Sequence, residues 1–291
     1  MTTSETPIEE GGTALINDCR ELVRIVARLS ESIRGTECPI HSSLDVAEDL
    51  ALKLVLHASS AVHLTAGTPV PLPGETPVVG DHASIAILAR ACLDIPLLLQ
   101  ALLCDTRLQP DERSFRVFVW RLRDLHARRK VLNLSPKLRS QAEGELKEIE
   151  ALQERLRATR TFQGLSDPDT KQALLNGKRS IFDIVGLGGV ADRCGYGVAV
   201  MSWRRQLNSH VHSGPSSVAH IRAPGSLGVR AQDMSAPMWS IAMALAVFAE
   251  GFSGLFREAQ DMFNRDEAAL RLVRLYCELA AQPSKDRGVA T

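Results

Sequence analysis

Aromatic residues are scarce in this chain of 291 residues, where Phe, Trp and Tyr together make up 4% of the sequence. Sandwiches and barrels use aromatic and β-branched side chains heavily, so this scarcity argues against a β-rich fold. Hydrophobic residues at 45% and charged residues at 23% are ordinary values for a folded protein and exclude extensive disorder. Long stretches rich in Ala, Leu and Arg indicate helices instead.

An excess of charge of one sign is also missing, because 34 Lys and Arg residues balance 34 Asp and Glu residues. No global field therefore attracts the chain to nucleic acid or to an anionic membrane, and any anion site must be local. A strong local excess lies in 113–134, where seven basic residues stand against Asp124. This segment predicts a basic amphipathic helix. Its basic face either pairs with the acidic residues of 143–150, which we favour, or follows a phosphate backbone.

Cysteine pairs at metal-binding or redox spacing are absent. The six cysteines include no Cys-x-x-Cys pair and no histidine at zinc-finger spacing, so we predict buried free thiols, no bound metal and no other cofactor. The first twelve residues, MTTSETPIEEGG, contain neither the apolar segment of a secretory signal nor an arginine-rich transit peptide. Both observations lead us to expect a protein of the reducing cytoplasm.

Two long apolar segments, 84–104 and 238–256, raise the question of membrane spans. Arg90, Asp94 and Gln100 would lie inside the first segment, and each charge costs about 2.5–3.5 kcal/mol at the middle of a bilayer. We therefore predict two buried helices of a soluble protein and no membrane association. Arg90 and Asp94 are four residues apart, so a helix places them on one face, where a buried ion pair is expected.

Hydrophobic periodicity predicts an all-α fold, a single-domain helical bundle that extends over 13–281. We expect flexible tails at 1–12 and 282–291. The run GTPVPLPGETPVVG at 67–80 alternates proline and glycine too often for a helix or a central strand, so a loop is expected there. A second long loop, polar and containing glycine and proline, is expected near 213–236.

The segment 196–215, YGVAVMSWRRQLNSHVHSGP, predicts an amphipathic helix that ends at a glycine and a proline. One face is apolar, with residues at steps of four, three and four: Tyr196, Val200, Trp203 and Leu207. The opposite stripe is polar, with residues at steps of three, four and three: Ser202, Arg205, Ser209 and His212. An arginine and a histidine on one face suit a phosphodiester. Guanidinium can hold two phosphate oxygens, and imidazole can accept or donate the proton of a ribose hydroxyl.

These residues resemble the HEPN superfamily, whose all-helical members carry an arginine, four to six arbitrary residues and a histidine. RQLNSH from Arg205 to His210 has four intervening residues and Arg205 to His212 has six, so both histidines fit. The resemblance implies a metal-independent endoribonuclease or an RNA-binding relative in a defence or toxin system. It also implies a homodimer that brings two motifs together, and an antitoxin is a conceivable protein partner.

In this resemblance Arg205 is the phosphate clamp, His210 or His212 is the acid–base group, and Ser202, Asn208 and Ser209 support them. A looser likeness over 84–215, carried by LARACLDIPLLL, is to an uncharacterised family of bacterial helical proteins and bears on the fold alone. The alternative function is a catalytically silent helical module that binds a partner or a ligand.

A dinucleotide-binding fingerprint is a further possibility, because Gly186, Gly188 and Ala191 match G-x-G-x-x-A. The acidic residue that should follow about twenty positions later is absent from 206–211. We therefore predict a loop at the entry to a helix here and no dinucleotide site.

Overall fold

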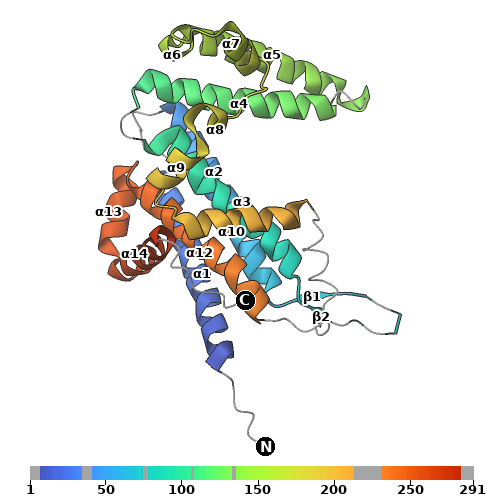
Figure 1. Cartoon of the computed structure of the whole chain (residues 1–291), viewed down its shortest axis with the longest axis vertical. Helices are drawn as coiled ribbons and strands as arrows, with labels where there is room; N and C mark the ends of the chain where they lie inside the picture. Colours follow the sequence, from blue (N-terminus) through green and yellow to red (C-terminus); the bar gives the residue numbers. More distant parts are fainter. Residues whose placement is uncertain are drawn as a thin grey trace, which may run out of the picture. The chain divides into compact units, whose positions relative to one another are not determined.

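The computed structural model describes residues 7–34, 41–71, 78–105, 108–132, 136–212 and 231–282, together with 73, 74 and 76. The described chain is almost entirely helical, so the predicted all-α class is confirmed (Figure 1). The helical region expected at 13–281 consists of two compact units. The first is built from the chain up to Leu99 and from Ala191 onward, and the second from Gln100–Val190.

Two helix boundaries differ from those predicted. Helix α1 begins at Pro7, so residues 7–12 of the expected tail are helical. Proline is well tolerated at a first helical position. Helix α12 begins at Ala231, so 231–236 of the expected polar loop are helical and Pro237 lies inside the helix. The rest of that loop, 213–230, and both tail segments 1–6 and 283–291 lie outside the described residues.

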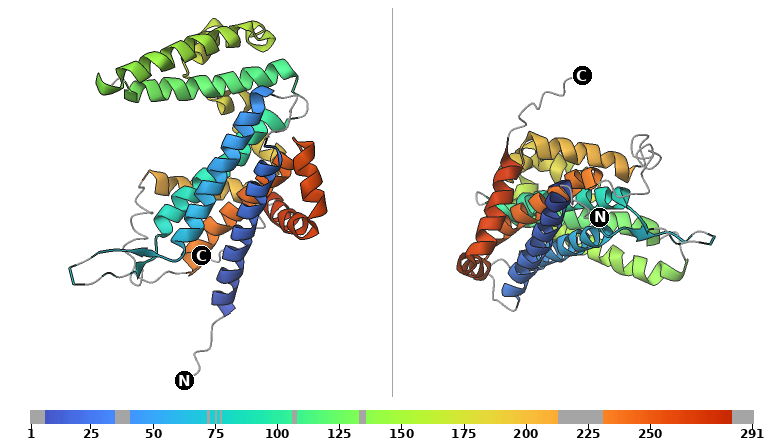
Figure 2. Two further views of the ribbon diagram at one scale, coloured as in Figure 1. Left: turned by 180° about the vertical axis from the view of Figure 1, so that it is seen from behind. Right: turned by 90° about the horizontal axis from the view of Figure 1, so that it is seen from below.

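Long helices form the centre of the first unit. They are α1 (Pro7–Ser32), α2 (His41–Leu64), α3 (His82–Leu99) and α12 (Ala231–Ser253). Helix α12 packs against both α1 and α3, and α2 packs against the same two helices (Figure 2). The shorter helices of this unit are α10 (Val198–Val211), α13 (Arg257–Arg265) and α14 (Glu267–Ala281). Helix α10 lies against α3 and α12, whereas α13 and α14 pack on α1 and α12.

The apolar periodicity of α1 explains why it lies in the core. Cys19, Leu22, Val26 and Ile33 are fully buried, while Arg24 is exposed on the opposite side of the helix. Larger side chains from other helices complete this core, and those buried most fully are Tyr276, Phe248, Phe252, Leu54, Ile85 and Leu93. The first unit is therefore held together by aliphatic and aromatic side chains buried between its packed helices.

The proline- and glycine-rich segment contains a small hairpin. Strand β1 (Thr68–Pro69) pairs antiparallel with β2 (Val78–Val79), with Thr68 opposite Val79. Gly67 precedes this hairpin with φ of 86°, and a Cβ atom there would lie 2.5 Å from Cγ1 of Val78. Both the left-handed backbone and the close side chain require glycine at this position.

The second unit is a helical hairpin with short helices on it. Its elements are η1 (Gln100–Cys104), α4 (Pro110–Leu132), η2 (Pro136–Leu138), α5 (Arg139–Ala158), α6 (Arg160–Gln163), α7 (Pro168–Leu175) and α8 (Ile181–Val185). Helices α4 and α5 run side by side and share a core with α6 and α7 (Figure 2). The core residues include Phe115, Phe118, Leu122, Leu125, Ile149, Leu152, Leu156, Phe162 and Leu174. This unit therefore has a hydrophobic core of its own.

One carboxylate connects the start of α4 with the residues that follow the end of α5. Asp111, in the first turn of α4, accepts hydrogen bonds from the backbone N–H groups of Arg160 and Thr161 at 2.9 Å each. It also accepts one from the hydroxyl of Thr161 at 2.9 Å. Partial desolvation opposes ionisation of this carboxyl, but the hydrogen bonds prevail and the pKa of Asp111 is below its usual value.

Two helical stretches of the described chain, His82–Cys104 and Met234–Ser253, are long and apolar enough to cross a membrane. Their most apolar windows are 61% and 72% buried within the structure. The core helices of a soluble protein have the same property, so the absence of membrane association stays a prediction.

Candidate functional site

Helix α10, which carries the predicted site residues, begins directly against the end of another helix. The N–H of Gly197 donates to the carbonyl oxygen of Ala280, near the end of α14, at 2.8 Å. A Cβ atom at position 197 would lie 2.5 Å from the carbonyl oxygen of Gln282. The positive end of α10 thus meets the negative end of α14, and only glycine allows the approach.

The inner face of α10 is the apolar face that the sequence predicts. Val200 and Leu207 are buried on this helix, Tyr196 is buried just before it, and Trp203 is half-buried. Burial raises the pKa of Tyr196, and nearby groups, of which Cys194 has the largest effect, raise it further. This face fixes the rotation of α10 about its axis and therefore determines which residues face outward.

An ion network ties α10 to α3. Asp94 forms an ion pair with Arg90 on its own helix, as the spacing of four suggested, and accepts a 2.8 Å hydrogen bond from Nε of Arg204. The arginine side chains are 14% and 15% exposed, whereas Asp94 is 32% exposed, so the expected pair forms but is half-buried and not fully buried. Sequence reasoning missed Arg204. Helical periodicity could have indicated it, because Arg204 lies next to Trp203 of the apolar face and is rotated by about 100° from the exposed Arg205.

The outer face of α10 presents the predicted polar stripe. Ser202, Arg205, Asn208 and His212 are exposed, and Ser209 is half-buried. The hydroxyl of Ser209 donates to the carbonyl oxygen of Gln206 at 2.8 Å, so it serves the helix backbone. Within the described chain Arg205 forms no ion pair, which leaves its guanidinium available to an anion from outside.

The two histidines differ in their relation to Arg205. His210 is five residues along the helix, a rotation of about 140° from Arg205, and it is half-buried with a buried Nδ1 atom. His212 is seven residues along, which returns it to the same face, and it caps the helix as an exposed residue. The structure therefore brings Arg205 together on one face with His212 and turns His210 away.

The distance along this face limits the chemistry. Seven residues of helix rise about 10.5 Å, and the side chains of α10 lean toward its N-terminus. Arg205 and His212 of one chain are therefore separated by about two helical turns along this face.

Five cysteines lie in the described part of the chain, and none of them forms a disulfide. Burial raises the pKa of Cys19 and of Cys104 to about 12, and it also raises the pKa of Cys92 and Cys277. These thiols are protonated at neutral pH and are poor nucleophiles or metal ligands. No cluster of His, Cys, Asp and Glu suited to a metal ion occurs among the described residues.

The glycine-rich segment forms no dinucleotide fold. Residues 181–185 form helix α8, and Gly186 with φ of 74° separates it from α9 (Leu187–Arg193). A dinucleotide fingerprint requires a strand before its first glycine. The segment is therefore a turn between two short helices.

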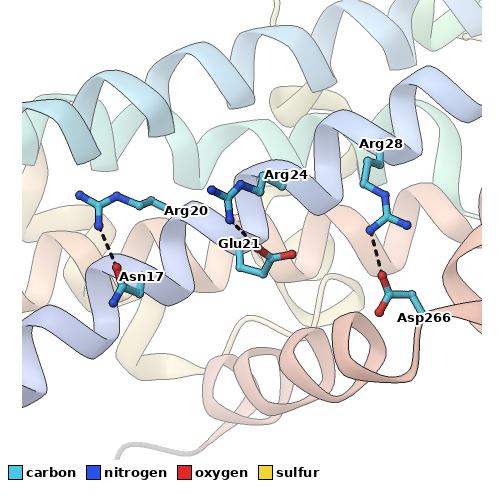
Figure 3. Close-up of polar contacts among 6 residues, drawn as sticks. All are labelled: Asn17, Arg20, Glu21, Arg24, Arg28 and Asp266. Carbon is cyan, nitrogen blue, oxygen red and sulfur yellow. Dashed lines mark hydrogen bonds and ion pairs between the residues drawn. The ribbon is translucent and has the colours of Figure 1, made fainter.

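Another polar face lies along α1, where three arginines are spaced by four residues. Figure 3 shows Arg20 donating to Asn17, Arg24 to Glu21 and Arg28 to Asp266. An open hollow beside this row is lined by Arg28, Glu258, Asp261, Met262, Arg265, Asp266 and Glu267. Each arginine of the row has a partner from the chain itself, so the row is less suited to an external anion than Arg205, for which the described residues supply no ion pair.

Comparison with protein-family models, with curated proteins and with solved structures gives no match to this chain.

Proposed function

We propose that this protein binds RNA on the outer face of α10 and cleaves it without a metal ion, as a ribonuclease of the HEPN type. The observation that carries the proposal is that two consecutive arginines have different surroundings. Arg204 is held by Asp94 at 2.8 Å, while Arg205 faces solvent on the side of the helix that carries His212. A guanidinium and an imidazole on an exposed face are the groups that phosphodiester cleavage needs.

The proposed chemistry is an intramolecular transfer. The imidazole of His212 removes the proton of a ribose 2′-hydroxyl, and the oxygen attacks the adjacent phosphorus. The bond from phosphorus to the 5′-oxygen breaks, and that oxygen takes the proton that the imidazolium of His212 now carries. The products are a 2′,3′-cyclic phosphate and a 5′-hydroxyl. Arg205 stabilises the negative charge that grows on the phosphate oxygens.

The same geometry supports the proposal of a homodimer. Because Arg205 and His212 of one chain are about 10.5 Å apart along the helix, a second copy would bring the complementary group to the same phosphodiester. Sedimentation at micromolar concentration should show a dimer. We further propose that the protein acts in the cytoplasm, without membrane association, where RNA is available.

The decisive test is cleavage of a fluorescently labelled RNA in EDTA. We expect both Arg205→Gln and His212→Gln to lower the rate at least about 100-fold, as the loss of a phosphate ligand or an acid–base group does. His210→Gln, on the other side of the helix, and Arg257→Gln, an 89% exposed arginine on α13, are the matched controls and should keep the wild-type rate. Absence of cleavage by the wild type, or cleavage that survives both site variants, would refute the proposal.

A catalytically silent interaction module is the second candidate, and one observation favours it. Val198, at the start of α10, is 66% exposed, and an exposed apolar side chain can serve as a contact for a protein partner. An antitoxin-like protein would be a partner of this kind. A protein without ribonuclease activity that forms a dimer through α10 would support this candidate, and loss of that dimer in Val198→Asp would locate the contact.

A further inference from the structure

The second unit carries a positive charge that the balanced total conceals. Residues 100–190 contain 17 Lys and Arg residues against 12 Asp and Glu residues, although the whole chain has 34 of each kind. Such an asymmetry between parts of a chain is typical of a protein that meets an anionic partner. The question is which of these cations remain available to a partner.

Several cations of this unit are neutralised by the unit itself. Arg116 is buried, donates to the carbonyl oxygen of Ala101 at 2.9 Å and pairs with Glu112 at 2.6 Å. Arg128 lies 3.1 Å from Asp124 and 3.6 Å from Glu145 of α5, which is the pairing with the acidic helix that the sequence favoured. These contacts account for only part of the basic helix.

Four other cations form what we call the basic cluster: Arg123, Lys130, Lys178 and Arg179. All four are exposed, and within the described chain no ion pair involves any of them. Two carboxylates feel the charge of this cluster: Asp183, which interacts with Arg123 and Arg179, and Asp167, which interacts with Arg179. Hydrogen bonds from the backbone and the side chain of Ser180 lower the pKa of Asp183, and the charges of Arg123 and Arg179 lower it further. Its carboxylate is committed to the capping box of α8.

Two elements meet to form the basic cluster. Arg123 and Lys130 are seven residues apart on α4, so they share one side of that helix. His126 lies between them, and its Nε2 donates to the carbonyl oxygen of Leu175, at the end of α7, at 3.0 Å. The amide of Gln153 on α5 donates to the same oxygen at 2.8 Å. These bonds hold the end of α7 against α4.

A glycine allows the next residues to follow α4 closely. Gly177 has φ of 63°, and a Cβ atom there would lie 2.8 Å from Cδ2 of His126. The chain therefore turns directly over the imidazole ring, and Lys178 and Arg179 follow at once. Arg123, Lys178 and Arg179 carry the same charge and therefore repel one another. Packing of the turn against His126 holds them together despite this repulsion.

We infer that the basic cluster binds the phosphate backbone of RNA. Arg123 and Lys130 are separated by about 10.5 Å along α4, a span over which a nucleic acid strand presents several phosphates. Lys178 and Arg179 widen the positive surface, and the arginines supply the planar donors that suit phosphate oxygens. The inference rests on the proposed function for its choice of RNA among polyanions. It assigns to the second unit a substrate-holding role separate from α10.

The test is fluorescence anisotropy of a labelled single-stranded RNA at several salt concentrations. We expect the fourfold variant R123Q/K130Q/K178Q/R179Q to bind at least about 10-fold more weakly. The slope of log K against log salt should fall by about 3, at roughly 0.7 for each lost phosphate contact. The matched control is R24Q/R34Q/R257Q/R271Q, which removes four exposed arginines that pair with an acid one turn away. This control should keep the wild-type affinity and slope.

Three results would overturn the inference. They are unchanged RNA binding by the cluster variant, an equal loss in the control variant, and cluster-dependent binding to anionic phospholipid vesicles without binding to RNA. A thermal scan of each variant shows whether it is folded. The single variant Gly177→Ala, which forces the turn away from His126, should weaken binding without any change in charge.

Cleavage and binding assays together distinguish failure of the ribonuclease proposal from failure of the basic cluster. If R205Q and H212Q abolish cleavage but bind RNA normally, both proposals stand. If the wild type binds RNA through the basic cluster but never cleaves it, the basic cluster stands and the ribonuclease does not. If cleavage depends on Arg205 while the cluster variant binds as the wild type does, the basic cluster alone is refuted.

Discussion

Nε of Arg204 donates to a carboxylate oxygen of Asp94 at 2.8 Å, and the two residues are 110 positions apart in the sequence. Asp94 is also paired with Arg90, so one carboxylate receives two guanidinium groups. The second pair lies within α3, whereas the first crosses from α3 to α10. The bond to Arg204 thus holds the helix that presents Arg205 and His212.

Removal of this carboxylate should destabilise the first unit. Asp94→Asn leaves two arginines that are at most 15% exposed without an opposite charge, and the expected loss is about 2–3 kcal/mol in the free energy of unfolding. Urea unfolding at neutral pH measures it. The control is Asp261→Asn, whose pair with Arg257 is long and exposed, and it should change stability by less than about 0.5 kcal/mol. Equal effects of the two substitutions would contradict this account of Asp94.

A methyl group at position 197 should separate α10 from α14. In Gly197→Ala the new Cβ atom would lie 2.5 Å from one backbone oxygen and 3.1 Å from another, so the helix must move. We expect a loss of about 1–3 kcal/mol in thermal or urea unfolding. Gly144→Ala is the matched control, because Gly144 lies on the exposed side of α5 with no atom within 4 Å of a new Cβ. That substitution should stabilise the protein by about 0.5–1 kcal/mol, and a loss there would show that the steric argument is wrong.

Stability of the second unit should depend on the ionisation of Asp111. Its pKa is lowered in the folded protein, so its contribution is present above the unfolded value of about 3.9 and disappears as the pH falls through the folded pKa. We expect Asp111→Ala to cost about 1 kcal/mol near neutral pH, as the loss of a helix cap does. In unfolding experiments below the folded pKa the difference from the wild type should vanish. The exposed Glu150→Ala is the control, and a gap for Asp111→Ala that persists in acid would point to lost packing instead.

The buried thiols should resist alkylation in the folded protein. Because burial raises the pKa of Cys19 to about 12, little thiolate is present near pH 8. Mass spectrometry after iodoacetamide treatment should show labelling of Cys19 and Cys92 at least about 100-fold slower than in urea. Comparable rates in the two conditions would mean that these helices open readily.

Local patterns predicted those features that a single helix determines. The apolar face of α10, the polar stripe opposite it and the pair of Arg90 with Asp94 all follow from a period of 3.6 residues. The same periodicity separates His210 from His212, a distinction that the motif spacing alone did not make. The angle between the two histidines follows from the sequence, and the structure adds that His210 is half-buried whereas His212 is exposed.

Contacts between distant segments could not be predicted in this way. Arg204 meets Asp94, and Gly197 meets Ala280, only because α10 docks on α3 and α14. Adjacent arginines at 204 and 205 look alike in the sequence, and only the packing of Val200 and Leu207 decides which one turns inward. The boundary between the two compact units was not predicted from the sequence, for a related reason. The same helical period runs through both, and nothing in it marks the point where one core ends.

The unequal charge of the two units has a practical consequence. A neutral protein is expected to pass through charged chromatography media, but this one has 17 cations against 12 anions in Gln100–Val190 and the opposite imbalance elsewhere. At low ionic strength it should adhere to both anion and cation exchangers. If the basic cluster binds RNA as inferred above, cellular nucleic acid is retained on the second unit during purification, and a high-salt wash is needed before any nuclease assay.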